Sequence, residues 1–174
     1  LLGIYSLYIE ARGETVHGAM LGYYTIQSNI LVILFTIVTL VSNAVNNNFL
    51  KSSSYFIIKG GFVIMIFITF LVFHFVLRTH IMRTSPEYLY SHRNLIQHYF
   101  VPLSTLFDYF LFDTKGQLKY KYSFIWLSIP ISYGLFVYIH SYCFDGKFYN
   151  FKGTPHDFPY LFMDWKKMGL QKPS

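Results

Sequence analysis

Residues 21–41 form an apolar run that contains no charged side chain. About 20 helical residues are needed to cross the hydrocarbon core of a bilayer, so this run is long enough to span a membrane. Similar runs follow at residues 55–77, 97–112 and 122–144, with polar connectors between them. The sequence therefore predicts an all-α fold, a polytopic transmembrane helix bundle with four full spans.

Composition supports this fold class. Hydrophobic residues make up 53% of the chain and charged residues 13%, whereas a soluble domain carries about 25% charged residues. Residues 1–9 are also apolar but too short to cross, and Leu1 is not a methionine. We interpret this segment as the end of a partial first span. The length suits one domain, so we expect residues 1–174 to form a single transmembrane helical unit.

The formal net charge of +6 does not indicate nucleic-acid binding. The basic residues are scattered between apolar runs and form no stripe on one face, which a nucleic-acid site requires. Short lysine-containing loops are instead typical of multi-pass membrane proteins. We expect an integral, multi-pass protein of the cell membrane. Cys143 is the only cysteine, so no internal disulfide can form.

Four polar side chains from four predicted spans fall at one depth. Because successive spans alternate in direction, Thr25 and His98 lie near the starts of two spans, and His74 and His140 near the ends of two others, on the same side. At 1.5 Å per residue, each lies about 5 Å inside its span. Ionisable residues within spans are costly and are functional candidates.

A structural role without catalysis remains open for each of these residues. Thr25, Ser28 and Asn29 occupy positions i, i+3 and i+4 and share one helix face, but small polar residues also hold transmembrane helices together. Taken singly, His74 is compatible with a hydrogen bond to a neighbouring helix or with a side chain that extends to the membrane surface. His140 is compatible with a position in the membrane interface, and His98 with the end of a loop.

Asp108 lies deeper in its span than His98, about 15 Å further along the helix axis. We therefore predict that Asp108 is an ion-pair partner of Lys59, or of the lysine-containing loop at residues 113–121, near the opposite membrane face. Pro102 and Pro130 lie inside predicted spans and should kink them, since proline removes a backbone hydrogen bond.

Several motifs carry a family resemblance over about residues 22–164. They are YYTIQSN at residues 23–29, Lys59-Gly60, Val72-Phe73-His74, NLIQH at residues 94–98, Pro102, DYFLF at residues 108–112, Trp126, Pro130, Tyr133 and FPYLFMD at residues 158–164. Together they resemble the bacterial "Pr-six-Pr" family of six-helix membrane proteins. The resemblance implies a sixth helix after Asp164, which is not in this chain.

That family is distantly similar to the androgen-induced (androgen-dependent TFPI-regulating) family of animals, membrane threonine hydrolases that cleave fatty-acid esters of hydroxy fatty acids. The resemblance implies Thr25 as the nucleophile and His98 as its base. A threonine hydroxyl needs such a base, and a neutral imidazole can supply it.

Secondary roles follow from the same hypothesis. Ser28, Asn29 or Tyr133 are candidates to donate to the developing oxyanion. His74 and His140 are candidates to orient His98 or to bind a substrate carboxylate. The expected partners are membrane lipids or a lipid-ester substrate, and no cofactor is implied.

Two other functions stay open from the sequence. Three histidines and a water molecule can hold a catalytic zinc ion, so His74, His98 and His140 could form a metal-dependent hydrolase. The polar cluster could also bind a lipid or small molecule without turnover.

Overall fold

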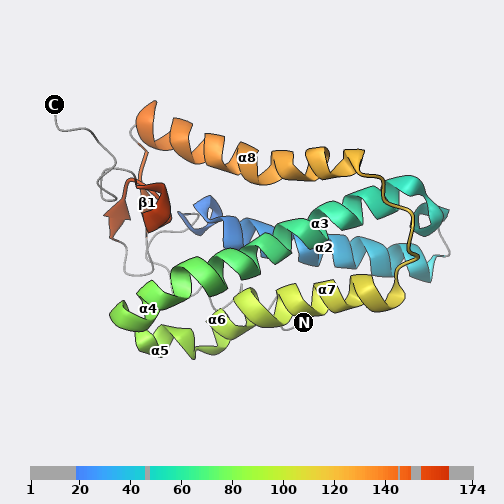
Figure 1. Ribbon diagram of the computed structural model, residues 1–174, viewed down its shortest axis with the longest axis horizontal. Coiled ribbons are helices and arrows are strands. Elements are labelled where there is room, and N and C mark those ends of the chain that lie inside the picture. Colours follow the sequence, from blue (N-terminus) through green and yellow to red (C-terminus); the bar gives the residue numbers. More distant parts are fainter. Residues whose placement is uncertain (1–18, 46–47, 145, 150–153, 165–174) are drawn as a thin grey trace.

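The apolar runs fold as helices in the computed structural model, which describes residues 19–45, 48–144, 146–149 and 154–164. Figure 1 shows the long helices side by side along one direction. They are α2 (Tyr24–Ala44), α3 (Ser53–Leu71), α7 (Val101–Phe112) and α8 (Lys121–Tyr142). The predominantly helical fold is confirmed, whereas the partial span expected at residues 1–9 lies outside the described residues.

The helix that begins with α3 is longer than the sequence predicted. It starts at Ser53, where the Ser52 hydroxyl accepts a hydrogen bond from the Tyr55 amide at 3.2 Å. It continues through a π-helical segment, η3 (Val72–Leu77), into α4 (Arg78–Thr84). It ends before Pro86, because the residue that precedes a proline is pushed out of helical geometry.

Three helical segments are long and apolar enough to cross a membrane. They are Tyr24–Ala44, Ser53–Thr84 and Lys121–Tyr142. Helix α7 has only 12 residues and does not belong to this group, so the count of four spans stays a prediction. Large apolar side chains such as Phe124 and Ile131 are exposed along α8, a surface that fits a lipid environment.

Helix α3 lies at the centre of the bundle and contacts α2, α7 and α8. Its contact with α8 depends on two glycines, because a Cβ at Gly60 would lie 2.6 Å from the Trp126 ring and one at Gly61 3.1 Å from it. The Trp126 indole also donates to the Ile57 carbonyl at 3.0 Å. Small residues therefore allow the two helices to approach closely.

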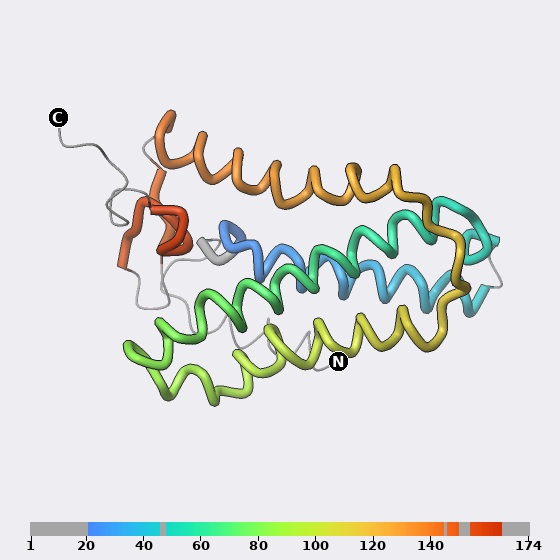
Figure 2. Tube along the Cα trace, in the orientation of Figure 1, coloured from blue at the N-terminus to red at the C-terminus, as the bar shows by residue number. Residues whose placement is uncertain are grey.

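The connections between α2 and α3 and between α7 and α8 lie at one end of the bundle (Figure 2). The first includes the 3₁₀ turn η2 (Asn48–Lys51). Near this end Lys59 Nζ lies 2.6 Å from an Asp108 oxygen and 2.8 Å from Asp113 Oδ1. The predicted Lys59–Asp108 pair is confirmed, with Asp113 as a second partner.

The opposite end is built from short segments. The 3₁₀ turn η1 (Ala19–Gly22) leads into α2, and α5 (Pro86–Leu89), α6 (His92–Leu95) and the π-helical η4 (Ile96–Phe100) lead into α7. Strands β1 (Phe148–Tyr149) and β2 (Pro155–His156) pair antiparallel, followed by η5 (Leu161–Met163). This C-terminal segment folds back beside the start of α2 (Figure 1).

Candidate active site

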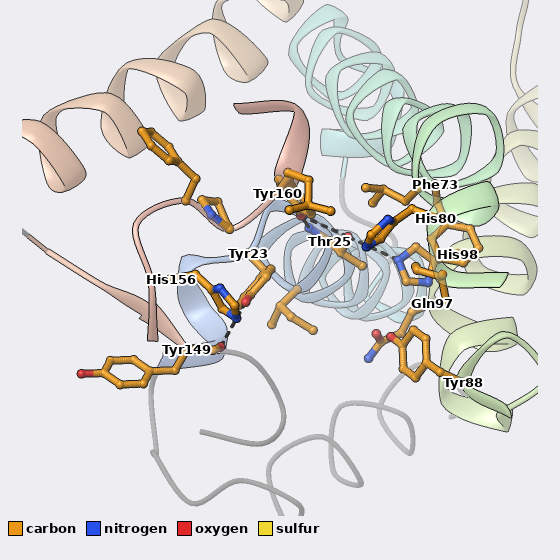
Figure 3. A pocket seen from close by; sticks show the side chains of 16 residues that line it. Tyr23, Thr25, Phe73, His80, Tyr88, Gln97, His98, Tyr149, His156 and Tyr160 are labelled. Carbon is orange, nitrogen blue, oxygen red and sulfur yellow. Dashed lines mark hydrogen bonds between the residues drawn. The ribbon is translucent and has the colours of Figure 1, made fainter. Parts of the chain in front are cut away.

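Thr25 lies in the first turn of α2, at the end of the bundle where the C-terminal segment folds back. Backbone amides in the first turn of a helix have no partner within the helix. The Thr25 amide donates instead to the Tyr160 hydroxyl at 3.3 Å. The Thr25 Oγ1 atom lies 3.4 Å from the Tyr160 hydroxyl and 3.5 Å from His98 Nε2. Figure 3 shows Thr25 between these two side chains.

His98 is buried in the π-helical segment η4. Its Nδ1 atom lies 3.2 Å from the Asn94 carbonyl oxygen, which can only accept a hydrogen bond. Nδ1 therefore carries the proton, and in a neutral imidazole Nε2 is left as the acceptor. Nε2 faces the Thr25 hydroxyl, so this tautomer can take the hydroxyl proton.

Local sequence explains the position of His98. The Ser91 hydroxyl caps α6 by accepting from the Asn94 amide at 3.3 Å, and the Asn94 side chain donates to the Leu89 carbonyl at 2.9 Å. Pro102, four residues after His98, has no amide to donate to the His98 carbonyl. The helix takes a π-helical turn directly before it, and such turns are frequent at functional sites.

The His98 ring is held by stacking on Phe73, with ring centroids 3.8 Å apart and planes 25° apart. Phe73 is buried and comes from η3, the π-helical segment that follows α3. Two π-helical segments from separate helices therefore meet at the candidate base.

Tyr160 is the main site residue for which the sequence analysis predicted no role. Tyr160 belongs to the FPYLFMD motif, but it lies 135 positions from Thr25 in the sequence, so no local pattern predicts their contact. Its ring lies edge-on to Tyr23 at 5.8 Å and stacks on Phe162 at 5.4 Å. Burial raises the pKa of the Tyr160 phenol, while its hydrogen bonds with Thr25 act in the opposite direction. The phenol therefore stays protonated and able to donate.

Thr25 and His98 line a pocket of about 360 Å³. We call it the tyrosine-lined pocket, after Tyr23, Tyr88, Tyr149 and Tyr160 in its wall (Figure 3). Other polar groups of its wall are Gln97, His80 and His156. The Tyr23 hydroxyl donates to the Tyr149 carbonyl at 3.1 Å, which joins the start of α2 to β1.

Ser28 and Asn29 are fully buried between helices. The Ser28 hydroxyl lies 2.8 Å from the Thr69 hydroxyl and 3.0 Å from the Thr25 carbonyl oxygen. The Asn29 amide donates to the carbonyls of Thr25 and Gln97, at 2.8 and 3.3 Å. These contacts match the packing role that the sequence left open, and they join α2 to α3 and η4.

The other candidates lie in separate surroundings. His74 Nδ1 lies 3.2 Å from the Tyr99 hydroxyl, and the His74 ring stacks on Phe70. His140 stacks on Phe136 and lies edge-on to Phe148. Neither histidine is among the residues that line the tyrosine-lined pocket.

Tyr133 lies near Thr25 without a direct bond to it. Its hydroxyl donates to the Gly22 carbonyl at 2.9 Å, and its ring packs against Tyr24 with centroids 5.0 Å apart. Its proposed role as an oxyanion donor stays a prediction.

The described part of the chain contains no group of three or more His, Cys, Asp or Glu side chains arranged to hold a metal ion. His74, His98 and His140 thus do not converge as the zinc hypothesis requires.

Comparisons of the chain with family models, with curated proteins and with solved structures gave no match. The family resemblance carried by the motifs stays a prediction. The function is therefore argued from the geometry of Thr25, His98 and Tyr160.

Proposed function

We propose that this chain is a multi-pass protein of the cell membrane that hydrolyses lipid esters, with Thr25 as nucleophile and His98 as general base. One observation carries the proposal: on the wall of a pocket, Thr25 Oγ1 lies 3.5 Å from Nε2 of a buried histidine whose Nδ1 faces the Asn94 carbonyl. This distance is at the outer limit of a hydrogen bond. Such contacts are often long before substrate binds and shorten in the complex.

The reaction uses these groups in two steps. Thr25 Oγ1 attacks the ester carbonyl carbon while its proton passes to His98 Nε2. The C–O bond to the alcohol then breaks, and the alcohol leaves with that proton. A water molecule, deprotonated by His98, attacks the acyl-threonine and releases the fatty acid with Thr25 restored.

One hydrogen-bond donor and the charge of a helix N-terminus support stabilisation of the oxyanion. The Tyr160 hydroxyl lies within 3.4 Å of Thr25 Oγ1, and the first turn of α2 carries the partial positive charge of a helix N-terminus. Donors already aimed at the developing charge are usually the largest contribution to acyl-transfer catalysis.

A lipid substrate is favoured by the surroundings of the site. Thr25 lies in the first turn of one of the three helices that are apolar enough to cross a membrane. A lipid ester whose carbonyl group lies at the same depth in the bilayer as Thr25 would reach the threonine directly. Lipid binding without turnover is the competing function, and it requires no reactive hydroxyl.

A fluorophosphonate probe tests the proposal on the purified protein. We expect the probe to label Thr25 and Thr25→Ala to abolish labelling. His98→Gln should slow labelling by about 10²-fold or more, since a general base contributes 10²–10⁴-fold. Thr36→Ala is the matched control, because Thr36 lies on the same helix and its hydroxyl donates to the Val32 carbonyl.

Turnover is measured with a panel of hydroxy-fatty-acid esters. Labelling that persists in Thr25→Ala, or a folded wild-type protein that binds these esters and hydrolyses none, would refute the proposal.

A further inference from the structure

A second pocket, of about 170 Å³, adjoins the tyrosine-lined pocket. Thr25, Phe73, Leu77 and Tyr160 line both pockets. The candidate nucleophile therefore lies on the boundary between two cavities. An ester has two sides, the acyl chain and the alcohol, and a nucleophile must reach the carbonyl carbon where they join.

The wall of the second pocket is apolar. Ile68, Val72, Pro130, Phe162 and Met163 line it, and we call it the apolar pocket. Three further side chains of its wall carry hydroxyl groups. Those of Thr69 and Tyr133 are bonded to Ser28 and to the Gly22 carbonyl, and that of Tyr24 is buried. The surface that this pocket exposes is almost entirely apolar, so the pocket suits a hydrocarbon guest.

The two pockets differ in the chemistry that they offer. Gln97, His80 and His156 give the tyrosine-lined pocket hydrogen-bonding groups. An acyl chain has no group that would use them, whereas the alcohol part of a lipid ester can carry polar substituents. The acyl chain is therefore matched by the apolar pocket.

Gly134 leaves space in the wall of the apolar pocket. A Cβ atom at this position would meet no heavy atom within 4 Å. Gly134 lies four residues after Pro130, so both lie on the same face of α8. A larger side chain at residue 134 would therefore meet no clash at its first carbon.

We propose that the apolar pocket is the acyl-chain site and that the open space at Gly134 sets the longest acyl chain accepted. This inference rests on the proposed function, because it takes Thr25 as the point of attack.

Photoaffinity labelling tests the site without requiring turnover. The probe is a medium-chain fatty acid with a diazirine on its terminal carbon, whose carboxylate stands in for the ester carbonyl near Thr25. In the wild-type protein we expect crosslinks on Phe162 and Met163. One methylene of mismatch in an apolar pocket changes discrimination by about tenfold or more, so Gly134→Leu should lower labelling at least about tenfold.

Two controls make the result decisive. Ser132→Leu adds the same side chain at an exposed position of α8 and should leave labelling unchanged. A short-chain homologue of the probe should label Gly134→Leu as it labels the wild type, which also shows that the variant folds. If Gly134→Leu does not fold, Gly134→Ala, which adds a single carbon, should still lower labelling by the longer probe alone.

Equal labelling of Gly134→Leu and wild type by the medium-chain probe would overturn the inference. Crosslinks on Tyr88 or Tyr149 in place of Phe162 and Met163 would do the same. The proposed function fails separately, through fluorophosphonate labelling that does not depend on Thr25, so the two failures are distinguishable.

Discussion

Replacement of Lys59 by methionine should destabilise the protein because it leaves one of two carboxylates, that of Asp113, buried without a counter-charge. The Lys59 ammonium lies 2.6 Å from Asp108 and 2.8 Å from Asp113. The Asp108 side chain is 51% exposed and can be solvated, whereas the Asp113 side chain is 7% exposed. Methionine keeps an unbranched side chain and removes the charge.

The magnitude follows from these exposures. Removing one partner of a buried ion pair costs about 3–5 kcal/mol, because the other charge stays buried without compensation. An exposed pair contributes about 0–1 kcal/mol. Lys59→Met should therefore lower the free energy of unfolding by about 3–5 kcal/mol, nearly all through Asp113. The melting temperature should fall on the order of 10 °C for a chain of this size.

Thermal unfolding of the purified protein in detergent gives the measurement, with two double variants as the comparison. Adding Asp113→Leu to Lys59→Met removes the orphaned buried charge and should restore most of the lost stability, since an apolar pair often replaces a buried ion pair without cost. Adding Asp108→Leu leaves Asp113 unpaired and should restore little. Equal recovery in the two double variants would refute the reasoning from burial.

Two further predictions concern the site and the helix contacts. Tyr160→Phe should lower kcat for ester hydrolysis by about 10²–10³-fold, the usual loss for one oxyanion donor, with little change in KM; steady-state kinetics measures both. Gly60→Ala should lower the melting temperature, because the added Cβ would lie 2.6 Å from the Trp126 ring. The cost of this clash outweighs the about 1 kcal/mol by which alanine is preferred over glycine within a helix.

Each of these has a matched control. Tyr23→Phe removes a hydroxyl that lines the same pocket but donates to the Tyr149 carbonyl, so kcat should change only a few-fold; equal losses from Tyr160→Phe and Tyr23→Phe would argue against an oxyanion role. Gly134→Ala makes the same exchange where no atom lies within 4 Å and should not destabilise. A Gly60→Ala protein as stable as Gly134→Ala would mean that the α3–α8 contact tolerates the extra carbon.

Much of the helical framework was predictable from the sequence alone. The apolar runs at residues 21–41, 55–77 and 122–144 correspond to the three long apolar helices of the structure. Hydrophobic length is a local property, so it needs no knowledge of neighbouring segments. Depth along a helix axis is equally local, which is why the Lys59–Asp108 pair and the shared level of Thr25 and His98 could be expected.

The rotation of each helix about its axis could not be predicted, because it depends on how the helices pack together. His74 and His140 were expected at the level of Thr25, yet one contacts Tyr99 and the other Phe136 and Phe148. Ser28 shares a helix face with Thr25 but bonds to Thr69 between helices. Which face turns toward a given neighbour depends on how all the helices pack, and spacing within one helix does not contain that information.

The contact with Tyr160 depended on tertiary structure most of all. The C-terminal segment returns to the first turn of α2 and brings a phenol to the Thr25 hydroxyl and amide. No helical period connects positions so far apart. Local sequence sets the helices and the chemistry of their side chains, and contacts between distant parts of the chain set which of those side chains meet.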